Sequence, residues 1–203
     1  MTTRPFAVVT GASSGIGYEL AKQFAEHGHD LLIASEDAGI VEAQQALEAL
    51  GITVQSVRGD LSTPEGVNEL YDQIQLLGRA VDAIAMNAGI GVGGDFVRET
   101  DLETELTLID LNVRSTVHLA KLVLQDRVER GEGRVLFTSS IAPVMPGPFE
   151  AVYAASKAFI LSFSDALRNE LKDTQVTLTA LMPGPTETNF FHRQLSEPGS
   201  GKK

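Results

Sequence analysis

Residues 6–17 read Phe-Ala-Val-Val-Thr-Gly-Ala-Ser-Ser-Gly-Ile-Gly. A short apolar run of strand type leads directly into three glycines, and a segment of helical period follows them. Gly11 allows a tight turn, Gly15 lets a pyrophosphate approach the backbone, and Gly17 lets helix and strand pack closely. Because the start of a helix presents free N–H groups and a positive dipole to phosphate, the stretch predicts a dinucleotide-binding unit.

The same alternation of apolar run and helical segment continues along the chain. It is the pattern of βαβ units, and near-continuous apolar runs suit parallel strands that are covered on both faces. We therefore predict an α/β fold, a Rossmann-like doubly wound parallel sheet of about six strands with helices on both faces. The expected strands are residues 6–10, 31–34, 53–57, 81–86, 134–138 and 176–182.

The helical segments carry start and stop signals. Thr63 followed by Pro64 supplies an N-cap and a first-turn proline, and residues 100–103 fit a capping box. Glycines at 28, 51 and 78 mark helix ends. The apolar stripes are Ile16, Leu20 and Phe24; Ile40, Ala43, Leu47 and Leu50; Val67, Leu70, Ile74 and Leu77; Leu106, Ile109, Val113, Val117 and Ala120; and Ile160, Phe163, Leu167 and Leu171.

A chain of 203 residues fits one hydrophobic core. We expect a single NAD(P)-binding Rossmann-like domain over residues 1–195, without an internal linker or repeat. Residues 196–203 are polar and glycine-rich, and we expect them to form a disordered tail.

Charge and composition exclude several classes of protein. The chain has 16 Lys and Arg against 27 Asp and Glu, a formal net charge of -11. Nucleic acids and anionic membranes require clustered basic residues, so neither is an expected partner. The absence of cysteine excludes a disulfide framework, a thiolate metal site and a cysteine nucleophile.

No membrane or secretory segment is expected. The longest uncharged stretch, residues 135–149, contains three prolines and is shorter than the roughly 20 apolar residues of a membrane span. The apolar run that follows Arg4 stops at Gly11, too early for a signal peptide. We expect a cytoplasmic protein.

Other kinds of catalytic site have little support in the sequence. His27, His29, His118 and His192 are scattered, so no metal site is predicted. The serines lack the G-x-S-x-G elbow of an α/β-hydrolase, so a Ser-His-Asp triad is not expected either.

The motif T-G-x-x-x-G-x-G at residues 10–17 resembles that of the short-chain dehydrogenase/reductase family. Asn87, Ala88 and Gly89 resemble the N-A-G motif of that family, and the resemblance extends over residues 6–191. It implies an oxidoreductase that transfers a hydride between a nicotinamide cofactor and a carbonyl or secondary alcohol substrate.

The resemblance also implies the site residues. Asn112, Ser140, Tyr153 and Lys157 match the catalytic tetrad, in which Asn112 holds a water that links Lys157 to solvent. Asp60 matches the acidic residue that contacts adenine. The residues expected to bind the cofactor are Gly11, Ser13, Ser14, Gly15, Ile16, Gly17, Ser35, Glu36, Asp60, Leu61, Asn87, Ala88, Gly89, Tyr153, Lys157, Pro183, Gly184, Thr186 and Thr188.

Physical chemistry gives the catalytic residue types a reason to stand at these positions. Tyr153 and Lys157 are four residues apart, so both project from one face of a helix. A nearby ammonium lowers the pKa of a tyrosine from its ordinary value near 10, which would make Tyr153 a general acid and base. Ser140 follows a strand, where its hydroxyl can hold the substrate oxygen. Ser139 competes for this role, but strand alternation points it the other way.

Cofactor preference depends on the end of the second strand, where an acidic residue binds the ribose hydroxyls and a basic residue accepts a 2′-phosphate. Ser35 and Glu36 stand there, and no Lys or Arg occurs between Lys22 and Arg58. Ser14 occupies a loop position that is often basic in NADP-using relatives. NAD(H) is therefore favoured over NADP(H), although a serine rather than an aspartate stands at the usual selecting position.

The expected substrate is uncharged and fairly apolar, because residues 90–96, 142–149 and Phe190 and Phe191, which are expected to face it, are mostly apolar or small. Helices over residues 102–128 and 153–171 are expected to pair with those of a second subunit, in a homodimer or homotetramer. The alternative, in which they pack only on their own sheet, stays open.

The chain departs from the family pattern at its end. Only twelve residues follow Phe191, so a substrate lid and a seventh strand are expected to be missing. This leaves an alternative function open, a nucleotide-binding regulatory or scaffold protein with impaired catalysis. A sugar-nucleotide epimerase is a further alternative, although those relatives have a different glycine spacing and longer chains.

Overall fold

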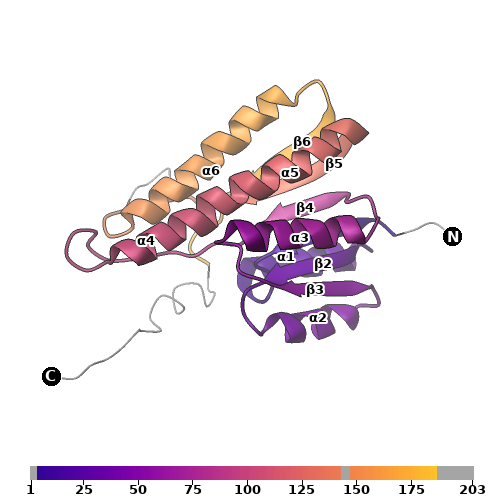
Figure 1. The fold of residues 1–203 in the computed structure, drawn as a ribbon, viewed down its shortest axis with the longest axis horizontal. Coiled ribbons are helices and arrows are strands. Elements are labelled where there is room, and N and C mark those ends of the chain that lie inside the picture. The colour runs from indigo at the N-terminus through magenta and orange to yellow at the C-terminus, as the bar shows by residue number, and fades with distance from the viewer. Residues whose placement is uncertain (1–3, 143–146, 187–203) are drawn as a thin grey trace.

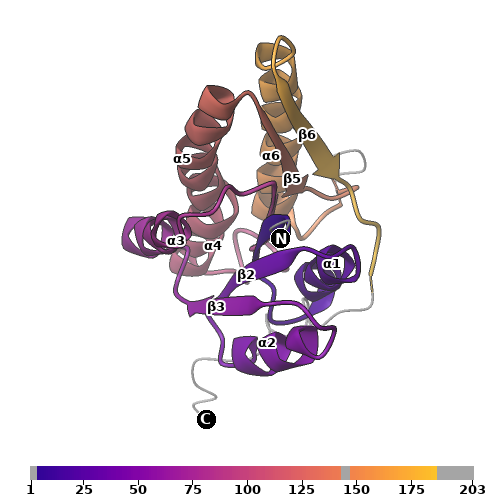
Figure 2. The same ribbon diagram turned by 90° about the vertical axis from the view of Figure 1, so that its right-hand side faces the viewer.

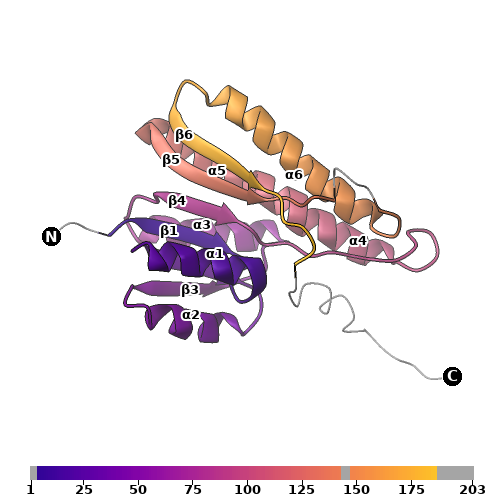
Figure 3. The same cartoon turned by 180° about the vertical axis from the view of Figure 1, so that it is seen from behind.

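Six parallel strands form one sheet in the computed structural model, which describes residues 4–142 and 147–186 (Figure 1). The strand order is β3-β2-β1-β4-β5-β6. The chain therefore starts in the middle of the sheet, winds outward to β3, crosses back to β4 and winds outward to β6 (Figure 3). This topology confirms the predicted doubly wound parallel sheet, and it creates a crevice between β1 and β4 at the carboxyl edge.

Each predicted strand is present, and no end differs from its prediction by more than two residues. β1, which leads into the first glycine turn, matches the prediction fully. The bounds are β1 (Phe6–Thr10), β2 (Asp30–Ser35), β3 (Val54–Arg58), β4 (Ala83–Met86), β5 (Glu132–Thr138) and β6 (Gln175–Leu181).

Helices cover both faces of the sheet, as predicted (Figure 2). One face carries α1 (Gly15–Glu26) and α2 (Ile40–Glu48). The other carries α3 (Pro64–Leu76), α5 (Ser115–Arg130) and α6 (Ala151–Glu170). Thr63 caps α3 as predicted, because its side chain accepts a hydrogen bond from the Gly66 amide at 3.1 Å.

Coverage differs between the middle and one edge of the sheet. Every residue of β1 and β2 is buried, as the near-continuous apolar runs predict. In β6 the pattern alternates, with Gln175, Thr177 and Thr179 exposed and Val176 and Leu178 buried. Within the described residues, β6 is therefore covered on one face only, by α6, and the expectation of two covered faces does not hold there.

The helix predicted after residue 100 is interrupted. It begins as α4 (Leu102–Ile109), continues as a π-helical turn, η1 (Asp110–Arg114), and then as α5. The capping-box prediction is one residue off, because Asp101, and not Thr100, is the N-cap and accepts a hydrogen bond from the Thr104 amide at 2.9 Å. Most of the predicted stripe, including Leu106, Ile109 and Val117, is exposed rather than packed on the sheet.

No helix among the described residues is long and apolar enough to span a membrane. The predicted tail, residues 196–203, and the last part of the predicted domain, residues 187–195, lie outside the described residues. The described residues form one sheet with its covering helices. A single domain over residues 1–195 stays a prediction.

Candidate active site

The glycine turn after β1 has the geometry that a phosphate group requires. Gly11 and Gly15 have φ values of 67° and 57°, which other residues rarely adopt. A side chain at Gly11 would lie 2.9 Å from the Cα atom of Ala88, and one at Gly17 would overlap the carbonyl of Gly11. The turn therefore brings the start of α1, with its positive dipole, to the carboxyl edge of β1. Ser14 is the N-cap of α1 and Ile16 lies in its first turn, so the residues present fit a dinucleotide pyrophosphate here.

Hydrogen bonds lock this turn to the neighbouring strands. The hydroxyl oxygen of Thr10 accepts bonds from the amides of Asn87 and Ala88, both at 3.0 Å. The side-chain amide of Asn87 donates to the Thr10 carbonyl at 3.2 Å and accepts from the Thr138 hydroxyl at 3.1 Å. Asn87 thus joins the carboxyl ends of β1, β4 and β5, which is a supporting role beside the cofactor site.

The two serines after β5 point in different directions. Ser139 is buried, and its hydroxyl donates to the carbonyl of Lys157 at 2.8 Å. Ser140 is only partly buried, and its side chain forms a hydrogen bond with Tyr153. This geometry agrees with the strand-alternation argument and leaves Ser140, not Ser139, beside the tyrosine.

Tyr153 and Lys157 lie together on the first turns of α6. The Nζ atom of Lys157 is 5.9 Å from the centre of the Tyr153 ring and donates a hydrogen bond to the Thr138 carbonyl at 3.0 Å. A side chain at Gly89 would lie 3.4 Å from this Nζ atom, so the N-A-G segment passes next to the ammonium group. The structure brings Ser140, Tyr153 and Lys157 together at the carboxyl edge of β4 and β5.

Asn112 completes this cluster from η1, but its side chain is already occupied. It accepts a hydrogen bond from the Ile90 amide at 2.9 Å, and it donates to the Ile90 carbonyl at 2.8 Å and to the Ser156 hydroxyl at 3.1 Å. The side chain therefore holds residue 90 against α6. The water-holding role that the resemblance implies stays a prediction.

The pKa of Tyr153 shifts in the opposite direction from the prediction. Burial raises the pKa of its phenol, the hydrogen bond with Ser140 lowers it, and the charge of Glu150 raises it. The ammonium of Lys157 lies over the ring and donates to the carbonyl of Thr138. Tyr153 is therefore a protonated phenol at neutral pH.

Lys157 is 5% exposed, and burial lowers its pKa from 10.5 to about 8. Its partner among the described residues is a neutral carbonyl, which accepts a hydrogen bond but offers no opposite charge. The group thus holds its proton at neutral pH and loses it at mildly alkaline pH.

The residues after β2, which are predicted to bind the cofactor ribose, lie close to the glycine turn. Ser35 is buried and donates to the Asp37 carboxylate at 2.9 Å, and Ser13 donates to the same oxygen at 2.6 Å. Glu36 is exposed, so the acidic residue that faces the glycine turn is Asp37. The lack of basic residues near Ser35 in the sequence is also misleading, because Arg58 pairs with Ser35 across β2 and β3, and its Nε atom donates to the Glu36 carbonyl at 2.8 Å.

The remaining predicted cofactor residues lie along the same edge. Asp60 follows β3 and accepts a hydrogen bond from the Ser62 amide at 2.8 Å, next to the buried Leu61. The carbonyl of Pro183 accepts from the Ile141 amide at 3.1 Å, which places Gly184 and Thr186 after β6, near Ser140. Thr188 lies outside the described residues.

Two predicted substrate-facing loops meet at one side of the cluster. The Gly94 amide donates to the Phe149 carbonyl at 2.8 Å, which joins residues 90–96 to the segment that precedes α6. Phe96, Ile141 and Phe149 are exposed there. Residues 143–146 and Phe190 and Phe191 lie outside the described residues.

Sequence reasoning missed four residues that the structure places in the site. Asp37 and Arg58 have a signal in the sequence, since the first follows Ser35 by two positions and the second ends the neighbouring strand. Thr138 and Ser156 hold Lys157 and Asn112. They have no sequence signal of their own, because Thr138 acts on Lys157 through its backbone carbonyl and Ser156 acts through a contact between distant segments.

Comparison with known proteins gives one consistent result. A family model described as short chain dehydrogenase matches residues 5–198. An uncharacterized short-chain type dehydrogenase/reductase from Sinorhizobium fredii is 35% identical over 199 residues, which cover 97% of this chain and 76% of the relative.

Solved structures agree. A short-chain dehydrogenase from Sphingobium yanoikuyae in complex with NADPH has 32% identity and a TM-score of 0.86, covering 94% of this chain and 74% of its own. A short chain dehydrogenase/reductase from Burkholderia phymatum in complex with NAD has 26% identity and a TM-score of 0.88, covering 98% and 72%.

Proposed function

The chain belongs to the short-chain dehydrogenase/reductase family, and we propose that it is an oxidoreductase that transfers a hydride between a nicotinamide cofactor and a carbonyl or secondary alcohol substrate. One observation carries the proposal. Ser140, Tyr153 and Lys157 converge at the carboxyl edge of the sheet, next to a glycine turn shaped for a pyrophosphate.

Each residue has a distinct task in this proposal. When bound, the nicotinamide cofactor supplies or accepts the hydride. The hydroxyl of Ser140 holds the substrate oxygen, and the phenol of Tyr153 exchanges a proton with it. Lys157 binds the ribose next to the nicotinamide and provides a positive charge near the phenol. Asn112 is a positioning residue that fixes residue 90 and α6 relative to each other.

The raised pKa of Tyr153 supports a role as the acid in carbonyl reduction. A buried phenol keeps its proton at neutral pH, and reduction needs a proton donor at the substrate oxygen. In oxidation the same group must first lose this proton, which a positive charge nearby favours. We therefore assign Tyr153 as the proton donor to a carbonyl.

The side chains around the cluster suit an uncharged, fairly apolar carbonyl compound. Phe96, Ile141 and Phe149 offer exposed apolar surface near Ser140. Among the described residues of the two loops, the charged groups are Asp95, which pairs with Arg98 at 2.7 Å, and Glu150, which precedes α6. An apolar substrate needs no compensating charge here.

Purified protein assayed with NADH and NADPH against ketones and aldehydes, and with the oxidised cofactors against secondary alcohols, tests this function by cofactor absorbance. Tyr153→Phe removes only the hydroxyl, so we expect turnover to fall by about 10²- to 10⁴-fold while cofactor affinity, measured by calorimetry, stays nearly unchanged. Turnover retained in the variant would contradict the assignment. Cofactor binding without turnover of any compound would favour a nucleotide-binding regulatory or scaffold protein.

We propose that the cofactor is NAD(H) in preference to NADP(H). The Asp37 carboxylate, held by Ser13 and Ser35, would repel a 2′-phosphate and accept hydrogen bonds from ribose hydroxyls. A basic residue near the end of β2, such as Arg58, would favour the 2′-phosphate of NADP(H). The Nε atom of Arg58, however, donates a hydrogen bond to the Glu36 carbonyl. We expect a higher kcat/KM with NADH than with NADPH, and Asp37→Ser should reduce this ratio about tenfold or more. An unchanged ratio would exclude Asp37 as the selecting residue.

We also propose a homodimer or homotetramer, formed through α4, α5 and α6. Leu102, Leu106, Ile109 and Val117 are exposed apolar residues along α4 and α5, and Phe159 is exposed on α6. Helix α4 lies beside α6 (Figure 1). Light scattering measures the oligomeric state, and Leu106→Glu should shift it to the monomer. Separately, we propose that the protein is located in the cytoplasm.

A further inference from the structure

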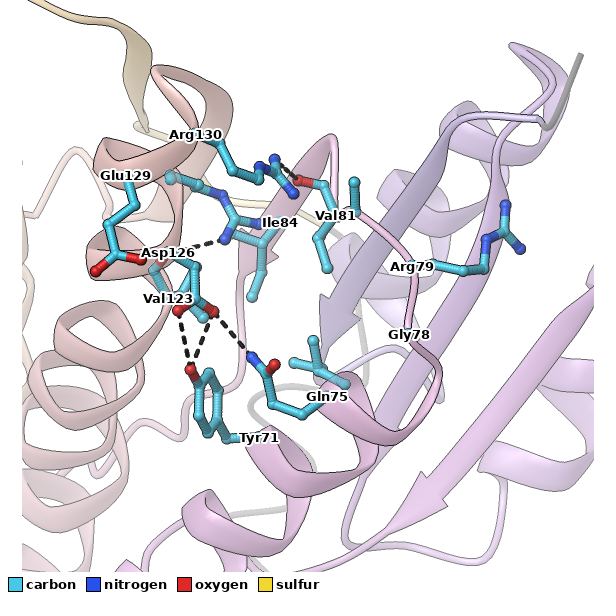
Figure 4. Close-up of a pocket in the computed structure, with 13 residues that line it drawn as sticks. Tyr71, Gln75, Gly78, Arg79, Val81, Ile84, Val123, Asp126, Glu129 and Arg130 are labelled. Carbon is cyan, nitrogen blue, oxygen red and sulfur yellow. Dashed lines mark hydrogen bonds between the residues drawn. The ribbon is translucent and has the colours of Figure 1, made fainter.

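A cavity lies at the opposite edge of the sheet from the candidate active site. It has a volume of about 370 Å³ and lies between the ends of α3 and α5, above the amino end of β4 (Figure 4). Its apolar wall comprises Ile74, Val81, Ile84 and Val123. None of the residues that line it belongs to the catalytic cluster or the glycine turn.

The cavity has a buried arginine in its wall. Arg127 is 2% exposed, and its Nη1 atom donates to the Val123 carbonyl at 3.0 Å. Its Nε and Nη2 atoms are buried and have no hydrogen-bond partner among the described residues. The fold makes room for this side chain at Gly133, where an added Cβ atom would lie 2.8 Å from Cγ and Cδ of Arg127.

The acidic groups near Arg127 are engaged elsewhere. The Asp126 carboxylate accepts hydrogen bonds from the Tyr71 hydroxyl at 3.0 Å and the Gln75 amide at 2.9 Å (Figure 4). Asp82 accepts from the Phe6 amide at 2.7 Å. In residues 4–142 and 147–186, no ion pair within 4.0 Å involves Arg127.

The other two arginines that line the cavity each have an ion-pair or hydrogen-bond partner. Arg79 pairs with Asp30 at 2.8 Å, and Arg130 donates to the Val81 carbonyl at 2.9 Å. Burial and the neighbouring charge of Arg130 lower the pKa of Arg127 to about 10, so the group still carries its charge at neutral pH. An unpaired buried charge is costly, and a ligand of opposite charge would remove that cost.

The chemistry of the two unpaired atoms identifies the ligand. Nε and Nη2 lie on the same edge of the planar guanidinium, and their parallel N–H groups match the two oxygens of a carboxylate. Both atoms have almost no accessible surface in the ligand-free structure, so a ligand reaches them only if side chains of the wall move. We propose that this cavity binds a small organic carboxylate, whose entry displaces these side chains so that its two oxygens lie on the Nε and Nη2 atoms of Arg127 and its hydrocarbon part on the apolar wall. The rim residues Gln75, Ala80, Glu129 and Arg130 are exposed, so entry from solvent runs past surface side chains.

Calorimetry with 4-phenylbutanoate tests the proposal, with the uncharged 4-phenylbutanamide and inorganic phosphate as comparison ligands. Wild-type protein should bind the carboxylate, and the amide and phosphate should bind at least tenfold more weakly, since one lacks the charge and the other lacks the apolar part. Saturation should also raise the Tm, by roughly 3 to 6 °C at ten times the Kd.

Arg127→Met removes the guanidinium at similar length, and Arg134→Met, which removes an exposed arginine from the same edge of the sheet, is its control. We expect Arg127→Met to weaken carboxylate binding about 10- to 100-fold and to leave the ligand-free Tm equal to or above that of the wild type. Arg127→Lys keeps the charge but lacks the paired N–H groups, and it should also weaken binding. Arg134→Met should bind like the wild type.

Several results would overturn the proposal. They are the absence of carboxylate binding to the wild type, equal affinity for the amide, tighter binding of phosphate, and undiminished affinity in both Arg127 variants. If Arg127→Met fails to fold, Arg127→Lys and the amide comparison still decide the outcome.

Discussion

Two buried cations lie at opposite ends of β5, and they differ in their hydrogen-bond partners. Lys157 lies against the carboxyl end of β5, where its ammonium donates to the carbonyl of Thr138. Arg127 lies against the amino end of β5, where Gly133 makes room for it and two of its nitrogen atoms lack a partner among the described residues. One end of the strand holds a hydrogen-bonded cation, and the other holds a partly unpaired one.

The difference lies in what burial does to each group. Burial lowers the pKa of Lys157 to about 8, close to neutrality, so this group can exchange a proton under physiological conditions. It lowers the pKa of Arg127 only to about 10, so the guanidinium stays charged and attracts an anion. We infer that the carboxyl edge is suited to proton chemistry and the amino edge to binding.

The largest expected effect is a difference in kcat/KM between variants of the two cations. Lys157→Met should reduce kcat/KM by about 10²- to 10⁴-fold, because it removes the positive charge next to Tyr153. Arg127→Met should leave kcat/KM within about threefold, because no catalytic residue contacts it. Steady-state assays of both variants on one substrate test this, and similar losses in both would contradict a division between the two edges.

The next effect is a pH dependence of stability that belongs to Lys157. Below pH 8 the lysine is protonated in both the folded and the unfolded protein, so the folded state carries the full cost of burying the charge. Between pH 8 and 10.5 it is neutral when folded but still protonated when unfolded, so stability rises with pH by up to about 3 kcal/mol. Tyr153, with its raised pKa, stays protonated over most of this window.

Urea unfolding of wild type and Lys157→Met at pH 7.5 and pH 10 measures this contribution. The difference in unfolding free energy between the two proteins should move in favour of the wild type at the higher pH. A difference that is independent of pH would mean that the pKa of Lys157 is not lowered.

The smallest effect concerns the acidic neighbour of Arg127. Tyr71→Phe removes a hydroxyl that donates to the Asp126 carboxylate and should lower the unfolding free energy by about 1 kcal/mol. The phenyl ring of this variant fills the same space as the phenol ring, so packing is retained. Tyr18→Phe, on α1, serves as a matched substitution away from the cavity. A loss larger than about 3 kcal/mol in Tyr71→Phe would contradict this assignment, because it exceeds what one hydrogen bond to a carboxylate contributes.

Much of the fold could be predicted from sequence because the signals are local. Apolar runs between glycine turns locate all six strands, and Thr63 with Pro64 marks the start of α3. The π-helical turn η1 has no such signal, because residues 102–128 read as one continuous helix. The alternating burial of β6 depends on which helices cover it, which is a property of the assembled sheet.

The site could be predicted from sequence where the position of a residue in its strand or helix decides the direction of its side chain. Strand alternation separates Ser139 from Ser140, and helical spacing brings Tyr153 and Lys157 to one side of α6. Contacts between distant segments were not predictable. The pairing of Arg58 with Ser35 depends on the order of strands, and the raised pKa of Tyr153 depends on how deeply the phenol is buried and on the nearby charge of Glu150.

The π-helical turn η1 contains one residue more than an α-helical turn would need to connect α4 to α5. Asn112 in η1 and Arg127 near the end of α5 belong to one helical rod, which extends from one edge of the sheet to the other. Deleting a single residue between 110 and 114 would therefore convert η1 to α-helix and leave Leu119 on the sheet and Arg127 in its recess. Deleting a single residue between 115 and 118 would instead rotate both side chains by about 100°, which would turn Leu119 off the sheet and Arg127 out of its recess.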